Sequence, residues 1–443
     1  MARNGFGPRA AALSEAIASR LWPIPLAATV VAVILGVVLP QVDRAIDQNL
    51  PATFAALLFG GGVEAARAVL SAIAGSVITV TSLTFSLTVV ALQLASSQGS
   101  PRLLRMFAAD RMVHATLAIF IGTFAYALTV LRTVEDATED AGAFVPRIAV
   151  TVASVLTLTS VVMLTFFLGH LARQLRLETM MRDAHREASR TIGMVWDAAP
   201  GRPAAVAPQT PQEAREVRAE SSGFLTEVNR SRLLDIAREH DVVVEEISPT
   251  GTSVVTGAPL LRWWSRSGAP TRADAGLDSA LRAQFSLAYE PTPAQDVSFG
   301  IRQITDIAMK ALSPGVNDPT TAEYAVGHLA DLLADIAARG PLPGSFADDS
   351  GAARLVPAHP SFASLVALSL GRVRHYGSGD PLVAGRLLRA YGEVGRRTVD
   401  DGQREVLRAE LARTLEAIDA HAADDTDVRA ARRIADEVRA TLG

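Results

Sequence analysis

The sequence of 443 residues contains no cysteine and a single lysine, Lys310. Without cysteine the chain cannot form disulfides, use a thiolate nucleophile or bind a metal ion through sulfur. The net charge of −4 offers no excess of basic charge for a nucleic acid. We therefore predict no nucleic-acid partner.

Common catalytic motifs are also missing. The sequence has no Gly-x-x-x-x-Gly-Lys phosphate loop, no Gly-x-Ser-x-Gly nucleophile elbow and no His-Glu-x-x-His metal motif. The eight histidines are scattered along the chain. We therefore expect a protein that is not an enzyme, with no metal site and no cofactor.

Apolar residues are abundant instead, at 49% of the chain, and they concentrate in the first 170 residues. A membrane-spanning helix takes about 20 mostly apolar residues. Four runs qualify, at 22–39, 69–95, 112–131 and 148–168. A shorter apolar run at 52–62 ends in three glycines and is either re-entrant or interfacial. Arginines gather before the first span, between the second and third, and after the fourth, which predicts that both termini are cytoplasmic.

The regions between these runs suggest how the remaining chain is organised. Residues 241–247 and 249–261 are rich in β-branched side chains bounded by turn residues, which indicates strands. The turn at 251–260 resembles that of lipoyl-type barrel-sandwich folds, but it lacks the acceptor lysine, so no covalent cofactor is expected. We predict an α-helical membrane protein with a cytoplasmic α+β region. Its parts would be a cytoplasmic N-terminus (1–21), a four-helix transmembrane domain (22–170), a juxtamembrane helix with a Pro/Ala linker (171–222), a small β-barrel-like module (223–265) and a helical bundle (266–443).

The second span carries small and hydroxylated residues in an ordered pattern. At about 100° per residue, one face holds five candidate pore-lining residues: Gly75, Thr79, Ser82, Ser86 and Gln93. Three threonines, Thr81, Thr84 and Thr88, lie nearly opposite. In a bilayer such a face marks close helix packing or a wetted surface.

Two interpretations of this face remain open. It is a seam against the other three spans, or copies of the helix surround a shared axis in a homo-oligomer and line a path for a small ion or solute. The second interpretation is our leading prediction. No acidic or basic residue lies at the centre of any span, which disfavours proton-coupled transport.

A polar segment near residues 295–322 supplies the other candidates, for binding a ligand or partner: Gln295, Asp296, Arg302, Ser313, Asn317, Asp318 and Thr320. The pattern predicts a helix, a turn at Ser313, and a second helix with Asp318 as N-cap and Pro319 in its first position. Strong caps explain most of these residues, but Asn317 has no capping role. The alternative function is therefore a membrane-anchored ligand-sensing or scaffold protein that recognises an anionic ligand or a partner at this helix N-terminus.

Two long segments resemble one bacterial family of predicted membrane proteins, domain of unknown function 2254. They are residues 83–102, LTFSLTVVALQLASSQGSPR, and residues 295–322, beginning QDVSFGIRQITDIAMKALSPGVNDP. The resemblance implies a multi-pass protein of the bacterial inner membrane, with four helices and a cytoplasmic region, and it supplies no activity. Members of that family usually carry a Gly…Arg-Thr step before Gln295, where this chain has Pro291.

Overall fold

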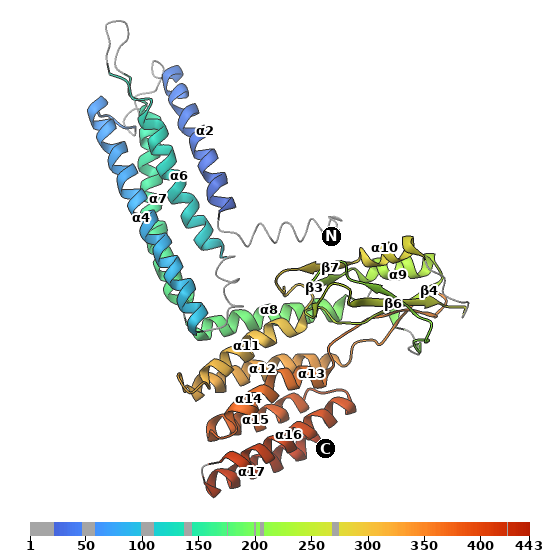
Figure 1. Cartoon of the computed structure of the whole chain (residues 1–443). Coiled ribbons are helices and arrows are strands. Elements are labelled where there is room, and N and C mark those ends of the chain that lie inside the picture. The colour runs from blue at the N-terminus through green and yellow to red at the C-terminus, as the bar shows by residue number, and fades with distance from the viewer. Residues whose placement is uncertain are drawn as a thin grey trace. The chain divides into compact units, whose positions relative to one another are not determined.

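The computed structural model describes residues 22–46, 58–98, 110–136, 144–174, 176–198, 201–203, 208–267, 274–422 and 424–443. These residues form two compact units (Figure 1). The four-helix unit ends at Arg176, and the mixed unit covers Leu177–Gly443. Three predicted segments fall wholly or partly outside the described residues. They are the N-terminal segment 1–21, residues 52–57 of the apolar run at 52–62, and residues 199–200 and 204–207 of the predicted linker.

The four-helix unit confirms the prediction of four apolar helices. All four are long and apolar enough to cross a membrane: α2 (Pro23–Ile46), α4 (Val63–Gln98), α6 (Arg111–Leu131) and α7 (Arg147–Gln174). A helix suits this environment because it satisfies its backbone hydrogen bonds internally. Helix α4 begins six residues before the predicted run, and its 36 residues make it about 54 Å long.

Helix α6 is the centre of this unit, because it packs against α2, α4 and α7. More than half of its apolar stretch is buried, compared with about a quarter in the other three helices. The approach to α2 is close: a Cβ on Gly36 would lie 2.8 Å from Cβ of Thr129, and Gly122 faces Ala28 and Ala32. Small residues spaced four apart on α2 therefore let the two helices pack tightly.

Charged groups lie at the two ends of this unit. At one end Arg44 pairs with Glu135 at 2.8 Å, and Arg67 pairs with Asp136 at 2.7 Å. At the other end Asp110 accepts a hydrogen bond from the backbone N–H of Met112 and caps α6. The 21 residues of α6 span about 31 Å between these ends, which matches a hydrocarbon core of about 30 Å.

Asp43 ties α2 to the beginning of α7. Its side chain accepts hydrogen bonds from the backbone N–H groups of Ile148 and Ala149, at 2.9 and 3.0 Å, and the residue is only 5% exposed. These N–H groups belong to the first turn of α7, where no carbonyl of the same helix can reach them. One carboxylate thus caps a helix that lies about a hundred residues further along the chain.

We expect Asp43→Ala to lower the free energy of unfolding by about 2–3 kcal/mol, because two buried N–H groups would lose a charged acceptor. Thermal unfolding of the protein in lipid nanodiscs measures this effect. Asp136→Ala is the matched control, since it removes an exposed ion pair worth at most about 1 kcal/mol. Equal shifts in the two variants would contradict the capping role.

The mixed unit contains two open sheets. The six-stranded sheet has the order β1-β8-β9-β4-β6-β2, and the three-stranded sheet has the order β5-β3-β7. The strands are β1 (Arg202–Pro203), β2 (Arg215–Arg218), β3 (Gly223–Val228), β4 (Val242–Glu246), β5 (Ser253–Val254), β6 (Pro259–Ser265), β7 (Phe285–Ala288), β8 (Phe346–Ala347) and β9 (Ala353–Val356). Val244 of β4 pairs antiparallel with Trp263 and parallel with Leu355.

The predicted barrel-like module is not confirmed. Among the described strands β1 and β2 remain at the two edges of the larger sheet, so this sheet does not close. Strands β8 and β9 come from a glycine-rich break between helices and extend the sheet beyond the expected residues 223–265. Buried Val244, Leu261 and Leu355 form part of the core beneath it.

Helices make up the rest of the mixed unit, as the sequence predicts for its C-terminal part (Figure 1). They are α8 (Leu177–Asp197), α9 (Arg230–Glu239), α10 (Ala275–Arg282), α11 (Val297–Ala311), α12 (Pro319–Arg339), α13 (Phe362–Val366), η2 (Ala367–Gly371), α14 (Arg372–Gly377), α15 (Pro381–Gly395), α16 (Asp401–His421) and α17 (Asp425–Leu442). Aspartate N-caps begin many of them: Asp274, Asp296, Asp318, Asp380, Asp400 and Asp424. Helix α11 packs between α8 and α12.

Candidate functional site

The candidate pore-lining residues lie on the outward face of α4. Gly75, Thr79, Ser82, Ser86 and Gln93 are all exposed on the four-helix unit. The opposite face, with Thr81, Thr84 and Thr88, is buried against the other helices. The face of α4 that packs against the other helices of the unit therefore carries the threonines. The face with the five candidate pore-lining residues does not take part in this packing.

The stripe is less polar than its composition indicates. The hydroxyl of Thr79 donates to the carbonyl of Gly75 at 2.8 Å, and that of Ser82 donates to Ile78 at 3.0 Å. Such bonds to the preceding turn satisfy hydroxyl donors within the helix. Gln93 lies two residues beyond Ala91, which packs with Val113 near the Asp110-capped end of α6. Gln93 therefore sits near one end of the unit.

Three of the other candidates form a joint between a strand and a helix, in which Asp296 is buried and Gln295 and Arg302 are half-buried. The side chain of Gln295 accepts a hydrogen bond from the backbone N–H of Val228, at 3.0 Å, at the end of β3. Asp296 is the N-cap of α11, and its Oδ2 lies 3.6 Å from Nη2 of Arg302. Burial raises the pKa of the Asp296 carboxyl, while Arg302 opposes this shift. Gly251, with φ +87°, leaves room for that carboxylate, since a Cβ there would overlap it.

The remaining candidates form the turn between α11 and α12. Asp318 caps α12 through the N–H of Thr321 at 3.0 Å, with Pro319 in the first turn, as the sequence predicts. The hydrogen bonds from Thr321 hold the pKa of Asp318 below its ordinary value. The hydroxyl of Ser313 donates a hydrogen bond to the backbone carbonyl of Lys310, and Thr320 is exposed.

The structure gives Asn317 a backbone role that the sequence analysis missed. Its φ of +49° is left-handed, a conformation that asparagine adopts more readily than most residues. The turn and the Gln295–Arg302 joint lie toward opposite ends of the 15-residue helix α11, about 20 Å apart. The seven candidates therefore form two separate groups.

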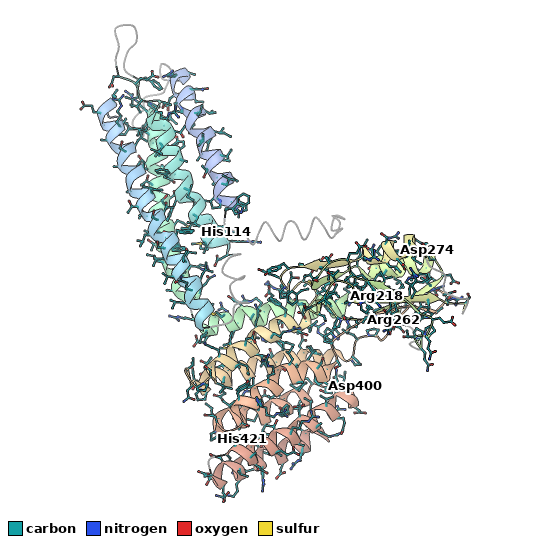
Figure 2. All side chains as sticks on the ribbon, in the orientation of Figure 1. His114, Arg218, Arg262, Asp274, Asp400 and His421 are labelled. Carbon is teal, nitrogen blue, oxygen red and sulfur yellow. The ribbon has the colours of Figure 1, made fainter. Side chains whose placement is uncertain are left out.

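A cavity of about 360 Å³ in the mixed unit was not predicted from the sequence. Its lining comes from the ends of α8 and α12, the loop at 359–361, and the beginning of α16, where Asp400 lies (Figure 2). Trp196 donates its indole N–H to the carbonyl of Gly340 at 3.0 Å. Gln403 is 5% exposed, and its Oε1 has no hydrogen-bond partner among the described residues. Burial and the nearby Arg230 lower the pKa of His359 to about 4.

A second cavity, of about 430 Å³, brings together two histidines that are far apart in the sequence. His185 Nε2 lies 3.2 Å from Asp331 Oδ2, and the His185 and His328 rings are 5.0 Å apart. Burial and His185 lower the pKa of His328. Within the described ranges, no group of three or more histidine, aspartate or glutamate side chains is placed to hold a metal ion.

Comparison with known proteins finds a matching family and similar sequences. The model of a family described as predicted membrane protein (DUF2254) matches residues 18–393. Three mycobacterial relatives, each 34% identical over 377 residues, are similar to 84% of this chain and 71% of their own length. They are "Uncharacterized protein Mb1321c" of Mycobacterium bovis, and "Uncharacterized protein Rv1290c" and "Uncharacterized protein MT1328" of Mycobacterium tuberculosis. No solved structure matches the chain.

Proposed function

Since the chain belongs to the DUF2254 family of predicted membrane proteins, we propose that it works in the bacterial inner membrane as a homo-oligomer. In this assembly the outward stripe of α4 faces neighbouring copies and lines a path for a small ion or solute. The proposal includes no catalytic step. The placement of the arginines supports an orientation with both termini in the cytoplasm.

The observation that carries this proposal is the division of α4 into two small-residue faces. Buried Thr84 marks the face that packs inside the unit, and exposed Ser86 marks the other. Elsewhere in the same unit, small residues on α2 and α6 permit tight packing, as at Gly36. A second small-residue face on α4 is suited to the same kind of contact with another copy.

A path along this stripe would be uncharged. Hydroxyl-lined pores without charged rings pass ions with modest selectivity, and apolar levels can close them by excluding water. Leu83 and Val90 are exposed beside the stripe and could form such apolar constrictions of the path. Small ions or neutral solutes are therefore the cargo that this chemistry favours.

Because the chain has no cysteine, single cysteines test the assembly directly. We expect Ser86→Cys to form a disulfide-linked dimer when membranes are oxidised, since disulfides need Cα atoms within about 7 Å. Thr84→Cys is the matched control, because this residue is fully buried only two positions away. Leu158→Cys, 67% exposed on α7, controls for random collisions.

Absence of dimers from cysteines at Thr79, Ser82 and Ser86 would overturn the proposed assembly. The path itself is tested separately by ion flux into proteoliposomes, which Ser86→Leu should reduce. An oligomer that cross-links but carries no flux would remove the path and leave only the interface.

A membrane-anchored ligand-sensing or scaffold protein is the second candidate function. The cavity at Trp196 favours it, because Trp196 belongs to α8, which begins three residues after the apolar helix α7 ends. An occupant of the cavity would contact the segment that directly follows the membrane helices. The anionic ligand or partner predicted at the turn with Asn317 and Asp318 stays a prediction.

A further inference from the structure

Two histidines meet where α8 packs against α12. The ring centroids of His185 and His328 are 5.0 Å apart, and both residues are half-buried. Both also line the cavity of about 430 Å³ in the mixed unit. Two positive charges at such a distance repel each other, and partial burial weakens the screening of this repulsion by water. Neutral rings are therefore compatible with the contact, and two protonated rings oppose it.

The surroundings of His185 favour a neutral ring. Its Nε2 lies 3.2 Å from Asp331 Oδ2, so this nitrogen carries the proton in the neutral ring. Its Nδ1 is buried and has no hydrogen-bond partner among the described residues. A protonated histidine donates from both nitrogens. Protonation of His185 would therefore bury an N–H group that has no acceptor, which is unfavourable.

Charged side chains from three helices also line the cavity around the two rings. They are Glu178 of α8, Glu323 and Asp331 of α12, and Arg386 of α15. The Asp331 side chain is 68% exposed, so water screens its attraction for a charged ring. The guanidinium of Arg386 is already paired with Glu393, at 2.9 Å. Helix α11 packs against α8 and α12 as well, but its charged residues do not line the cavity: Arg302, Asp306 and Lys310.

The sum of these effects is seen at His328. Burial and the neighbouring His185 lower the pKa of His328, and the opposing effect of Asp331 is smaller. A histidine whose pKa is lowered in the folded protein stabilises the fold at neutral pH. This contribution is lost as the pH falls below the unfolded pKa of about 6.5. Acid therefore acts against the contact between α8 and α12.

We propose that the His185–His328 pair is a proton-sensitive contact, which holds α8 on α12 at neutral pH and releases it when both rings are protonated. Helix α8 begins three residues after the apolar helix α7 ends. Its release therefore acts on the segment that directly follows the membrane helices. The inference rests on the second candidate function and names the proton as what the protein senses. It is independent of the proposed path along α4.

Hydrogen–deuterium exchange of the full-length protein in lipid nanodiscs tests this inference. After correction for the intrinsic effect of pH on exchange, the protection of α8 amides should fall about tenfold between about pH 7.5 and about pH 5.5. The lower pH lies one unit below the unfolded histidine pKa, and a ring that stays neutral in the folded contact gives this factor there. Helix α17, which contains no histidine, should keep its protection.

Neutral substitutions identify the rings as the cause. His328→Gln should reduce the loss of protection by about half or more, and the double variant with His185→Gln should abolish it. Both variants should keep the wild-type thermal midpoint at neutral pH, because glutamine is uncharged. His375→Gln is the matched control, since His375 is an exposed histidine of α14 in the same unit. This variant should show the full wild-type loss.

Any of three results would overturn the inference. The first is protection of α8 that stays constant between the two pH values in the wild type. The second is a loss that the double variant retains, which would place the sensitive group elsewhere. The third is an equal loss in α8 and α17, which would indicate unfolding of the whole unit.

None of these results bears on the cysteine cross-links. Labelling of Ser86→Cys at the two pH values tests the sensing function separately. Release of α8 in acid with unaltered labelling would retain the proton-sensitive contact and remove the sensing function.

Discussion

Gly251→Ala should destabilise the mixed unit by about 3–5 kcal/mol. Gly251 has a φ of +87°, where an alanine costs about 1–2 kcal/mol. Its new Cβ would also overlap the carboxylate of Asp296 and displace the N-cap of α11, which is worth about 1 kcal/mol. The displaced carboxylate would then lose its place beside Arg302. Chemical unfolding followed by the fluorescence of Trp263 and Trp264 measures the free energy.

Gly257→Ala provides a control for the cost of placing an alanine at a positive φ, without the overlap. Gly257 has a similar φ of +83°, but a Cβ there would meet no atom within 4 Å. We expect a cost of only about 1–2 kcal/mol. In a double-mutant cycle, adding Asp296→Ala to Gly251→Ala should cost less than Asp296→Ala alone, because the overlap is gone. Equal effects at the two glycines would exclude the overlap as the cause.

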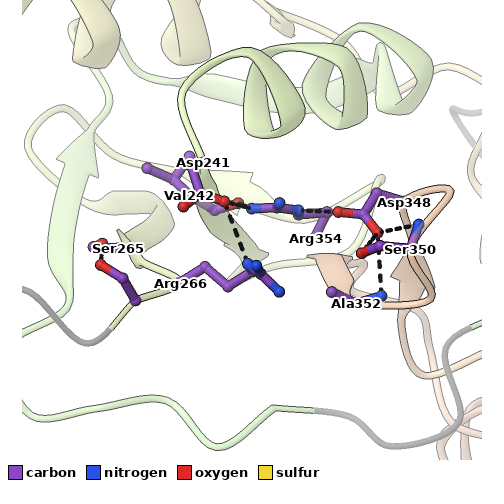
Figure 3. Close-up of polar contacts among 9 residues, drawn as sticks. Asp241, Val242, Ser265, Arg266, Asp348, Ser350, Ala352 and Arg354 are labelled. Atoms are coloured by element: carbon purple, nitrogen blue, oxygen red, sulfur yellow. Dashed lines mark hydrogen bonds and ion pairs between the residues drawn. The ribbon is translucent and has the colours of Figure 1, made fainter.

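Arg354→Met should lower the free energy of unfolding by about 3–5 kcal/mol. The guanidinium is 7% exposed and bridges two carboxylates, with its nitrogens 2.7 Å from Asp241 Oδ1 and 2.7 Å from Asp348 Oδ2 (Figure 3). The Asp348 side chain is only 12% exposed, so removing the guanidinium is costly because a largely buried carboxylate loses its cation. Asp241 is more than half exposed and contributes little to this cost. Arg266→Met is the matched control: Arg266 also contacts Asp241, but it is about half exposed, so its loss should cost less than 1 kcal/mol.

The effect of Arg354→Met should depend on pH. Hydrogen bonds from Ser350 and the charge of Arg354 hold the pKa of Asp348 well below its ordinary value. A lowered carboxyl pKa stabilises the fold above the unfolded pKa of about 4, and this contribution is lost as the pH falls toward the folded pKa. The difference between wild type and variant should therefore shrink between pH 5 and pH 2. A constant difference would contradict the role of ionised Asp348.

The features that the sequence predicted correctly depend on residues that are close together in the chain. The four spans follow from hydropathy, because crossing a bilayer demands long uncharged runs. The cap at Asp318 and the strand predicted at 241–247 depend on neighbouring residues only, and the structure confirms both, the strand as β4 (Val242–Glu246).

Other features depend on residues far apart in the sequence. Periodicity defined two hydroxyl faces on α4, but it could not tell which one packs against α6, because both are small and uncharged. The cavity joins Trp196 to Gln403 across two hundred residues. Strands β8 and β9 are two and four residues long, too short for an alternating pattern. The spacing of Ala28, Ala32 and Gly36, four residues apart, is a sequence pattern from which the close packing of α2 against α6 could have been predicted.

The unequal lengths of α4 and α6 have a consequence for the surrounding lipid. Helix α6 spans about 31 Å and α4 about 54 Å, yet α4 carries no charge after Arg67. About twenty residues beyond Arg67 are enough to cross the hydrocarbon. We therefore expect the uncharged end of α4, near Val90 and Leu94, to extend into the headgroup layer. Thicker bilayers would cover this end and thinner ones would expose it. The protein is therefore expected to be sensitive to bilayer thickness.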